Sequence, residues 1–102
     1  MSYIVTRTQT RPTTDVVWYT GAPFHTAEYT TWLGQNWIST GKLSLDFTVS
    51  PDRLTMTVVN TVVDEATWNE LSSQQQHIDY QALKTAWNQQ NGITQTTTFA
   101  TV

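Results

Sequence analysis

A chain of 102 residues is long enough for one hydrophobic core and too short for two, so we expect a single domain over residues 1–102. Only five lysines and arginines are present and the net charge is -3, which argues against sequence-independent nucleic-acid binding and against attraction to an acidic membrane through a basic patch. The absence of cysteine excludes a disulfide scaffold and a thiol catalyst.

The composition indicates a real core under a polar surface. Hydrophobic residues make up 38% of the chain, below the globular norm of about 45–50% with glycine counted. Five tryptophans, four tyrosines and three phenylalanines supply large apolar surfaces, and the 21 threonines suit strands. No run approaches roughly 18 apolar residues and no signal peptide is visible, so we expect a cytoplasmic location.

The chain begins with a predicted strand. Residues 2–10 are rich in Tyr, Ile, Val and Thr and contain no glycine. Pro12 ends this strand, and residues 13–22 are predicted to be a connection with a short extended piece at residues 16–19.

Residues 24–39 predict the first helix. Tyr29, Leu33 and Trp37 lie four residues apart and therefore share one face. Gly41 is a stop signal, because glycine takes the left-handed conformation that caps helices.

The middle of the chain predicts a β-hairpin. Residues 42–49 and 54–62 alternate apolar and polar side chains, and residues 50–53 (Ser-Pro-Asp-Arg) form a tight-turn sequence between them. Val59 and Val63 fall on the opposite face from the main apolar set. That set consists of Leu43, Leu45, Phe47, Val49, Leu54, Met56, Val58 and Val62.

A second helical segment follows, interrupted near its middle. Asp64 is the predicted N-cap of a helix over residues 65–72, and residues 73–76 are predicted to break or bend it. Residues 78–90 predict a further helix, stopped at Gly92. Its predicted apolar stripe consists of Ile78, Ala82, Leu83, Ala86 and Trp87.

A final strand at residues 94–102 completes the order β-α-β-β-α-β, the split pattern of ferredoxin-like α+β folds. Right-handed crossovers place the helices on one face of a four-stranded antiparallel sheet. We expect the open face to pack on a second copy of the chain, forming a homodimer. The alternative is a monomer whose open face is threonine-rich and solvated.

The segment from Val62 to Leu71 (Val-Val-Asp-Glu-Ala-Thr-Trp-Asn-Glu-Leu) resembles the strand-to-helix junction of the dimeric α+β barrel superfamily. That superfamily includes antibiotic-biosynthesis monooxygenase-like proteins. The resemblance extends to the element order and implies a dimer in which two sheets face each other. It transfers no activity, because one fold hosts many functions.

The resemblance fails at the position where enzymatic and haem-degrading relatives often have a histidine. Leu71 lies near that position and cannot act as a ligand or base, and His77 falls a turn and a half later. We therefore assign no catalytic residue and no cofactor.

Metal and catalytic motifs are absent from the pattern of residues. His25 and His77 lie in different segments without a metal-ligand spacing, so no metal site is predicted and both are interpreted as surface residues. The carboxylates are best interpreted as solvated, and no Gly-x-Ser-x-Gly elbow or phosphate-binding glycine loop occurs.

The aromatic supply suggests a pocket for a flat ligand between sheet and helices. The candidate pocket residues are Trp18, Asn36, Trp37, Asn60, Trp68 and His77. The competing interpretation places most tryptophans in the helix-to-sheet core, as their spacing predicts. Trp18 lies outside any periodic pattern and is the strongest candidate for an interface or pocket.

Three functions are consistent with these observations. The first is a non-catalytic homodimeric structural or binding module. The alternative is a cofactor-independent monooxygenase-like enzyme acting on a polycyclic phenol, or a binder of haem or an aromatic small molecule. A small-ligand sensor using the same cavity is the third.

Overall fold

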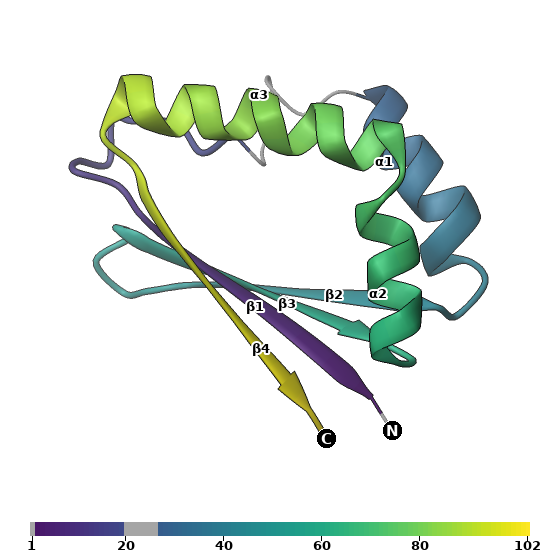
Figure 1. The fold of residues 1–102 in the computed structure, drawn as a ribbon. Coiled ribbons are helices and arrows are strands. Elements are labelled where there is room, and N and C mark those ends of the chain that lie inside the picture. Colours follow the sequence, from purple (N-terminus) through teal and green to yellow (C-terminus); the bar gives the residue numbers. More distant parts are fainter. Residues whose placement is uncertain (1, 20–26) are drawn as a thin grey trace.

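The chain forms a single antiparallel sheet with helices on one of its faces (Figure 1). The computed structural model describes residues 2–19 and 27–102. The strands are β1 (Tyr3–Thr10), β2 (Leu43–Val49), β3 (Thr55–Val62) and β4 (Thr94–Thr101). The helices are α1 (Ala27–Leu33), the π-helical turn η1 (Gly34–Ile38), α2 (Glu65–Ser72) and α3 (Gln75–Asn91).

The strand order is β2-β3-β1-β4, which confirms the ferredoxin-like βαββαβ topology predicted from the sequence. β1 pairs antiparallel with both β3 and β4, so β1 and β3 occupy the centre of the sheet. The two chain termini emerge side by side at one end, where Tyr3 pairs with Thr101 (Figure 1).

The hydrophobic core lies at the end of the sheet where α1 and α2 pack. It joins both central strands, β2 and these helices through buried apolar side chains. The cluster consists of Val5, Leu33, Trp37, Leu43, Val62, Trp68 and Leu71. The predicted inward face of the first helix is therefore confirmed, since Leu33 and Trp37 are buried and Tyr29 packs against them.

Helix ends follow the predicted local chemistry. The Asp64 carboxylate accepts a hydrogen bond from the Thr67 backbone N–H at 2.8 Å and caps α2. α2 ends at Ser72 and α3 begins at Gln75, which confirms the predicted interruption. Gly92 caps α3 with a φ of 70°, in the left-handed region that glycine adopts readily.

Residues 16–19, predicted as a short extended piece of the connection, belong to no strand of the sheet. Side chains bind two of their carbonyls: Arg11 donates to the Val16 oxygen at 2.8 Å and Trp87 to the Val17 oxygen at 2.9 Å. The predicted start of the first helix, residues 24–26, lies outside the described residues.

The end of the first helix is π-helical. In η1 the Ser39 N–H bonds the Gly34 oxygen at 2.8 Å, spanning five residues. Lys42 N–H bonds the Trp37 oxygen at 3.0 Å with the same span.

The predicted inward face of α3 is wrong. Ile78, Ala82, Leu83 and Ala86 share one face of this helix, but that face points to solvent, while Trp87 is half-buried. The buried residues of α3 are His77, Tyr80, Lys84 and Asn88. Periodicity shows which side chains lie together on a helix, and it does not show which face meets the sheet.

The open face of the sheet is rich in threonine. Register places Thr6, Thr8, Val59 and Thr57 together there, and all four are half-buried. Asp46 is the charged residue on this face among the described strands. None of the helices in residues 2–19 and 27–102 combines the length and apolarity needed to cross a bilayer.

The buried Leu71 of α2 and the exposed Leu83 of α3 should respond in opposite ways to truncation. Leu71→Ala should cost about 2–5 kcal/mol of unfolding free energy, because it leaves a cavity in the core. Leu83→Ala should change it by no more than about 0.5 kcal/mol, because Leu83 is 54% exposed. Urea titration followed by tryptophan fluorescence measures both, and a large loss for Leu83→Ala would contradict the outward placement of that face.

Candidate functional site

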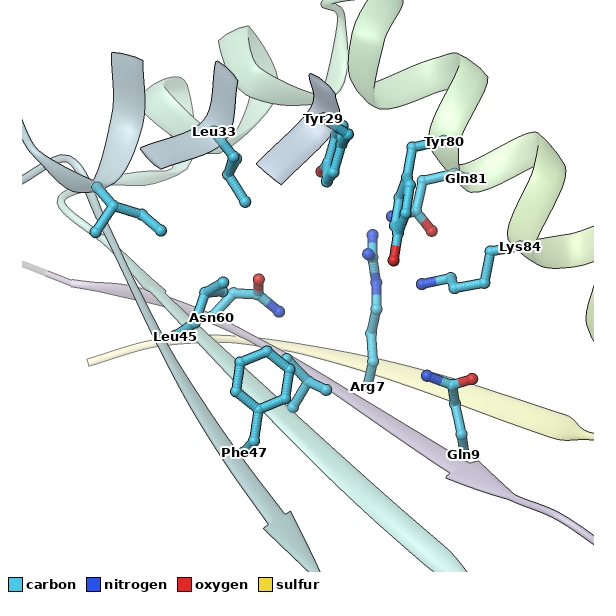
Figure 2. A pocket seen from close by; sticks show the side chains of 12 residues that line it. Arg7, Gln9, Tyr29, Leu33, Leu45, Phe47, Asn60, Tyr80, Gln81 and Lys84 are labelled. Carbon is cyan, nitrogen blue, oxygen red and sulfur yellow. The ribbon is translucent and has the colours of Figure 1, made fainter. Parts of the chain in front are cut away.

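A cavity of about 190 Å³ lies between the sheet and the helices, beyond the hydrophobic cluster (Figure 2). β1, β2 and β3 form its floor, and α1, η1 and α3 form its other walls. Its lining residues are Arg7, Gln9, Tyr29, Leu33, Ile38, Leu45, Phe47, Val58, Asn60, Tyr80, Gln81 and Lys84.

The alternation of β1 positions the polar floor. Val5, Arg7 and Gln9 share the helix-facing side, because strand side chains repeat every two residues. Val5 enters the hydrophobic cluster, whereas Arg7 and Gln9 line the cavity. Two neighbouring positions on the same side of β1 therefore belong to different regions: Val5 to the hydrophobic core and Arg7 to the cavity.

α3 positions the opposite wall. Tyr80 and Lys84 are four residues apart and project from the same side of the helix toward Arg7 (Figure 2). Tyr29 stacks on Tyr80 with ring centroids 4.1 Å apart and an interplanar angle of 2°. This stack fixes the tyrosine rings against each other and joins α1 to α3.

Two cations share the cavity without a carboxylate. Lys84 is 2% exposed, and no ion pair involves Arg7 or Lys84 within the described residues. The Arg7 guanidinium lies 5.5 Å from the centre of the Trp68 ring, and the Lys84 Nζ lies 5.9 Å from that of Tyr80. Aromatic faces attract cations, but they do not neutralise them.

Burial lowers the proton affinity of both groups, and the charge of Arg7 adds to this effect at Lys84. Burial, followed by the charge of Arg7, lowers the pKa of Lys84 to about 7. Burial also lowers the pKa of Arg7 from its usual range. Lys84 is thus divided between its ammonium and neutral amine forms near neutral pH.

The remaining titratable groups of this wall are uncharged. Burial and the charges of Arg7 and Lys84 lower the pKa of His77 to about 4, so its imidazole is neutral at physiological pH. Its Nδ1 is hydrogen-bonded to the Tyr29 hydroxyl at 3.1 Å. Burial raises the pKa of Tyr29 to about 12, and that of Tyr80 rises for the same reason.

Several polar atoms at the floor have no partner. Gln9 is 1% exposed, and neither its amide nitrogen nor its amide oxygen is hydrogen-bonded within the described residues. The Arg7 Nε is buried and likewise without a hydrogen bond there. Unsatisfied buried polar groups are costly, so these atoms are available to bond water or a polar ligand group in the cavity.

The cavity opens along the edge strand β2. Phe47 and Ile38 both line it and both are exposed, Phe47 by 52%. These two side chains therefore form the rim of its mouth. The deeper walls contain Leu33, Leu45 and Val58.

Three of the candidate residues from the sequence lie at or next to this cavity. Asn60 lines it and donates a hydrogen bond to the Val5 carbonyl oxygen at 3.0 Å. Trp68 and His77 lie one layer behind the lining, Trp68 against Arg7 and His77 against Tyr29. The rings of Trp68 and His77 meet edge to face at 5.8 Å.

The other three candidates lie elsewhere. The Arg11 guanidinium lies over the Trp18 ring, 4.7 Å from the ring centre. Trp18 is not among the residues that line the cavity. Trp37 belongs to the hydrophobic cluster. Asn36 is exposed and donates to the Trp32 carbonyl oxygen within its own helix.

Sequence reasoning missed Arg7, Gln9 and Lys84, although a signal for them existed. Arg7 and Gln9 fall on the same alternation as the apolar Val5, so polar groups on the covered side of a strand were visible in the pattern. Lys84 lies four residues from Tyr80 and seven from His77, a second helical stripe opposite the apolar one.

A metal centre has no support in the described side chains. No group of three or more histidine, aspartate or glutamate residues is placed to hold an ion within the part of the chain that the structure describes. His25 lies outside the described residues.

No family model and no curated protein matches this chain. Among solved structures, the chain is similar to that of Rv0793 from Mycobacterium tuberculosis, with 14% sequence identity and a TM-score of 0.49. The similarity covers 98% of this chain and 95% of that chain. An identity this low transfers no residue role.

Removing the buried charge should stabilise the protein. The pKa of Lys84 is about 7 in the folded state and 10.5 is its ordinary value, so the unfolded chain binds more protons between these pH values. Stability should therefore rise as pH increases through this window. Lys84→Met should be more stable at pH 6 by about 1–4 kcal/mol, with the difference shrinking as pH rises toward 10.

Urea titrations across this pH range measure the effect. Lys42→Met is the matched control, because Lys42 is exposed and should show no such pH-dependent difference. A Lys84→Met variant less stable than the parent at pH 6 would show that the ammonium has a favourable partner in the folded state.

Proposed function

We propose that this protein binds a small organic anion with an apolar, single-ring body in the cavity between the sheet and α3. The observation that supports it is a pair of cations, the half-buried Arg7 and the buried Lys84, which share that cavity without a carboxylate among the described residues.

An anionic ligand would supply what the site lacks. The planar guanidinium of Arg7 is suited to bidentate bonds with a carboxylate. A negative charge would also favour the protonated form of Lys84 and raise its pKa. The unpaired Gln9 amide would gain a partner at the same end of the ligand.

The apolar walls and the volume restrict the ligand's body. Leu33, Leu45 and Val58 would contact a ring, and Phe47 would cover it at the mouth. A cavity of about 150 Å³ is known to admit benzene, so 190 Å³ suits one ring with a small substituent. This size favours a single ring over the polycyclic phenol considered from the sequence.

Among the functions considered from the sequence, the geometry favours a ligand-binding module or sensor. The tyrosines and His77 are held neutral by burial, which suits a binding wall more than a proton-transfer site. A monooxygenase-like activity remains the alternative, and oxygen uptake with phenolic substrates tests it directly. Kinship with the dimeric α+β barrel superfamily is part of this proposal, supported by the element order and the junction from Val62 to Leu71.

Calorimetry with benzoate tests the anion site. Arg7→Met should weaken binding about tenfold or more, because a hydrogen bond to a charged group contributes about 1.5–3 kcal/mol. Arg53→Gln is the matched control: Arg53 is exposed in the β2–β3 turn and should leave the affinity unchanged. Equal binding of benzamide, the uncharged analogue, would contradict a site selected for negative charge.

The pH dependence of benzoate binding has a definite sign. Affinity should fall as pH rises above about 7, because Lys84 loses its proton with a pKa of about 7 while the carboxylate stays ionised. Below that pH the affinity should level off. An affinity that is flat between pH 6 and pH 9, within about twofold, would show that Lys84 does not face the bound charge.

We also propose that two copies associate through the open face of the sheet. Ile4 and Val59 lie on that face among threonines, no described segment covers it, and Asp46 is its charged residue among the described strands (Figure 1). A face of this kind is compatible with packing on a copy of itself.

Size-exclusion chromatography with light scattering should give twice the chain mass of 11.6 kDa at micromolar concentration. Val59→Lys should shift the protein to monomer by burying a charge. Thr97→Lys is the control, since Thr97 is exposed on the helix-facing side of β4. A monomeric parent protein would overturn this association.

A further inference from the structure

The position of the Lys84 amine suits it to attack a bound ligand as a nucleophile, in addition to attracting an anion as a positive charge. The side chain runs from α3 into the cavity and is 2% exposed, so its Nζ is reached through the cavity (Figure 2). Its Nζ lies 5.9 Å from the centre of the Tyr80 ring, and the described lining of the cavity contains no carboxylate to pair with it.

Arg7 acts on Lys84 as a neighbouring positive charge. Both groups line one cavity from opposite walls, and the described residues provide no carboxylate between them. An apolar cavity and an adjacent cation are the two devices by which proteins hold a lysine as a neutral, nucleophilic amine. The titration of Lys84 near neutral pH agrees with this arrangement.

We propose that Lys84 forms an imine with the carbonyl carbon of a small oxo acid whose carboxylate is held by Arg7. This inference rests on the proposed anion site and extends it to a class of ligand. In this arrangement Arg7 binds the carboxylate and Lys84 reacts with the carbonyl group. The apolar walls contact the ring.

The step balances without an oxidant or reductant. The amine nitrogen attacks the carbonyl carbon, and the carbonyl oxygen becomes the hydroxyl of a carbinolamine. The nitrogen then gives up its second proton, the C–O bond breaks, and water leaves as the C=N bond forms. The adduct is reversible, so the cavity can capture and release its ligand.

The chain contains its own control for this chemistry. Lys42 and Lys84 are its two lysines, and Lys42 is exposed at the start of β2 with its Nζ 5.3 Å from the Trp37 ring. Lys42 therefore reports ordinary surface amine reactivity in the same molecule.

Reductive trapping tests the proposal. The protein is incubated with phenylglyoxylate and cyanoborohydride near pH 7, and the adducts are assigned by peptide mass mapping. Lys84 should be modified about tenfold faster than Lys42 or more, because burial and Arg7 hold part of Lys84 as the neutral, nucleophilic amine near pH 7. Excess benzoate should slow modification of Lys84 and leave that of Lys42 unchanged.

Two comparisons separate this inference from the anion site itself. Benzaldehyde, which lacks the carboxylate, should show a smaller preference for Lys84, because only the neutral amine and not the Arg7 site then favours it, and benzoate should compete with it less effectively than with phenylglyoxylate. Lys42→Arg should leave the rate at Lys84 unchanged. Benzoate binding with no adduct at Lys84, or with Lys84 modified no faster than Lys42, would overturn the imine and leave the anion site standing. Failure of benzoate to bind or compete would overturn the anion site.

Discussion

The enclosure of two positive charges in one largely apolar cavity is the constraint on which the rest of this structure depends. Removing a cation from water costs several kcal/mol unless a counter-charge replaces the lost hydration. The adjoining hydrophobic cluster, which shares Leu33 with the cavity, supplies apolar burial that offsets this cost. β1 joins the two regions, since Val5 belongs to the cluster and Arg7 to the site.

α3 shows the same division between folding and function. Its buried side chains are polar, whereas Ile78 and Leu83 lie outside in solvent. A helix selected for stability alone would turn its apolar stripe toward the sheet. The reversed orientation is consistent with the general finding that functional sites are built at the expense of stability. The stacked Tyr29 and Tyr80 rings help to hold the helix in this unfavourable rotation.

The sequence was sufficient for the topology, because each element has a local signal that tertiary structure did not override. The alternation of the hairpin, the Asp64 cap and the Gly92 stop depend on neighbours in the chain. The cavity depends on which face of α3 meets the sheet, and no local pattern decides that choice. Tryptophans were predicted to line a pocket because they are large and aromatic. In the structure Trp37 belongs to the hydrophobic core and Trp18 packs on Arg11. Charge on the covered side of β1 was the better guide.

The π-helical turn has a consequence for how this pocket can change over evolution. Leu33 and Ile38 both line the cavity although they are five residues apart. In a regular α-helix two such side chains would point about 140° apart, and the wider winding of η1 brings them to the same wall. Loss of a single residue between them would restore regular winding and leave the two side chains four residues apart, which keeps them on one face of the helix. The segment can therefore lose the extra residue of its wide turn in one codon deletion and still present both side chains to this wall.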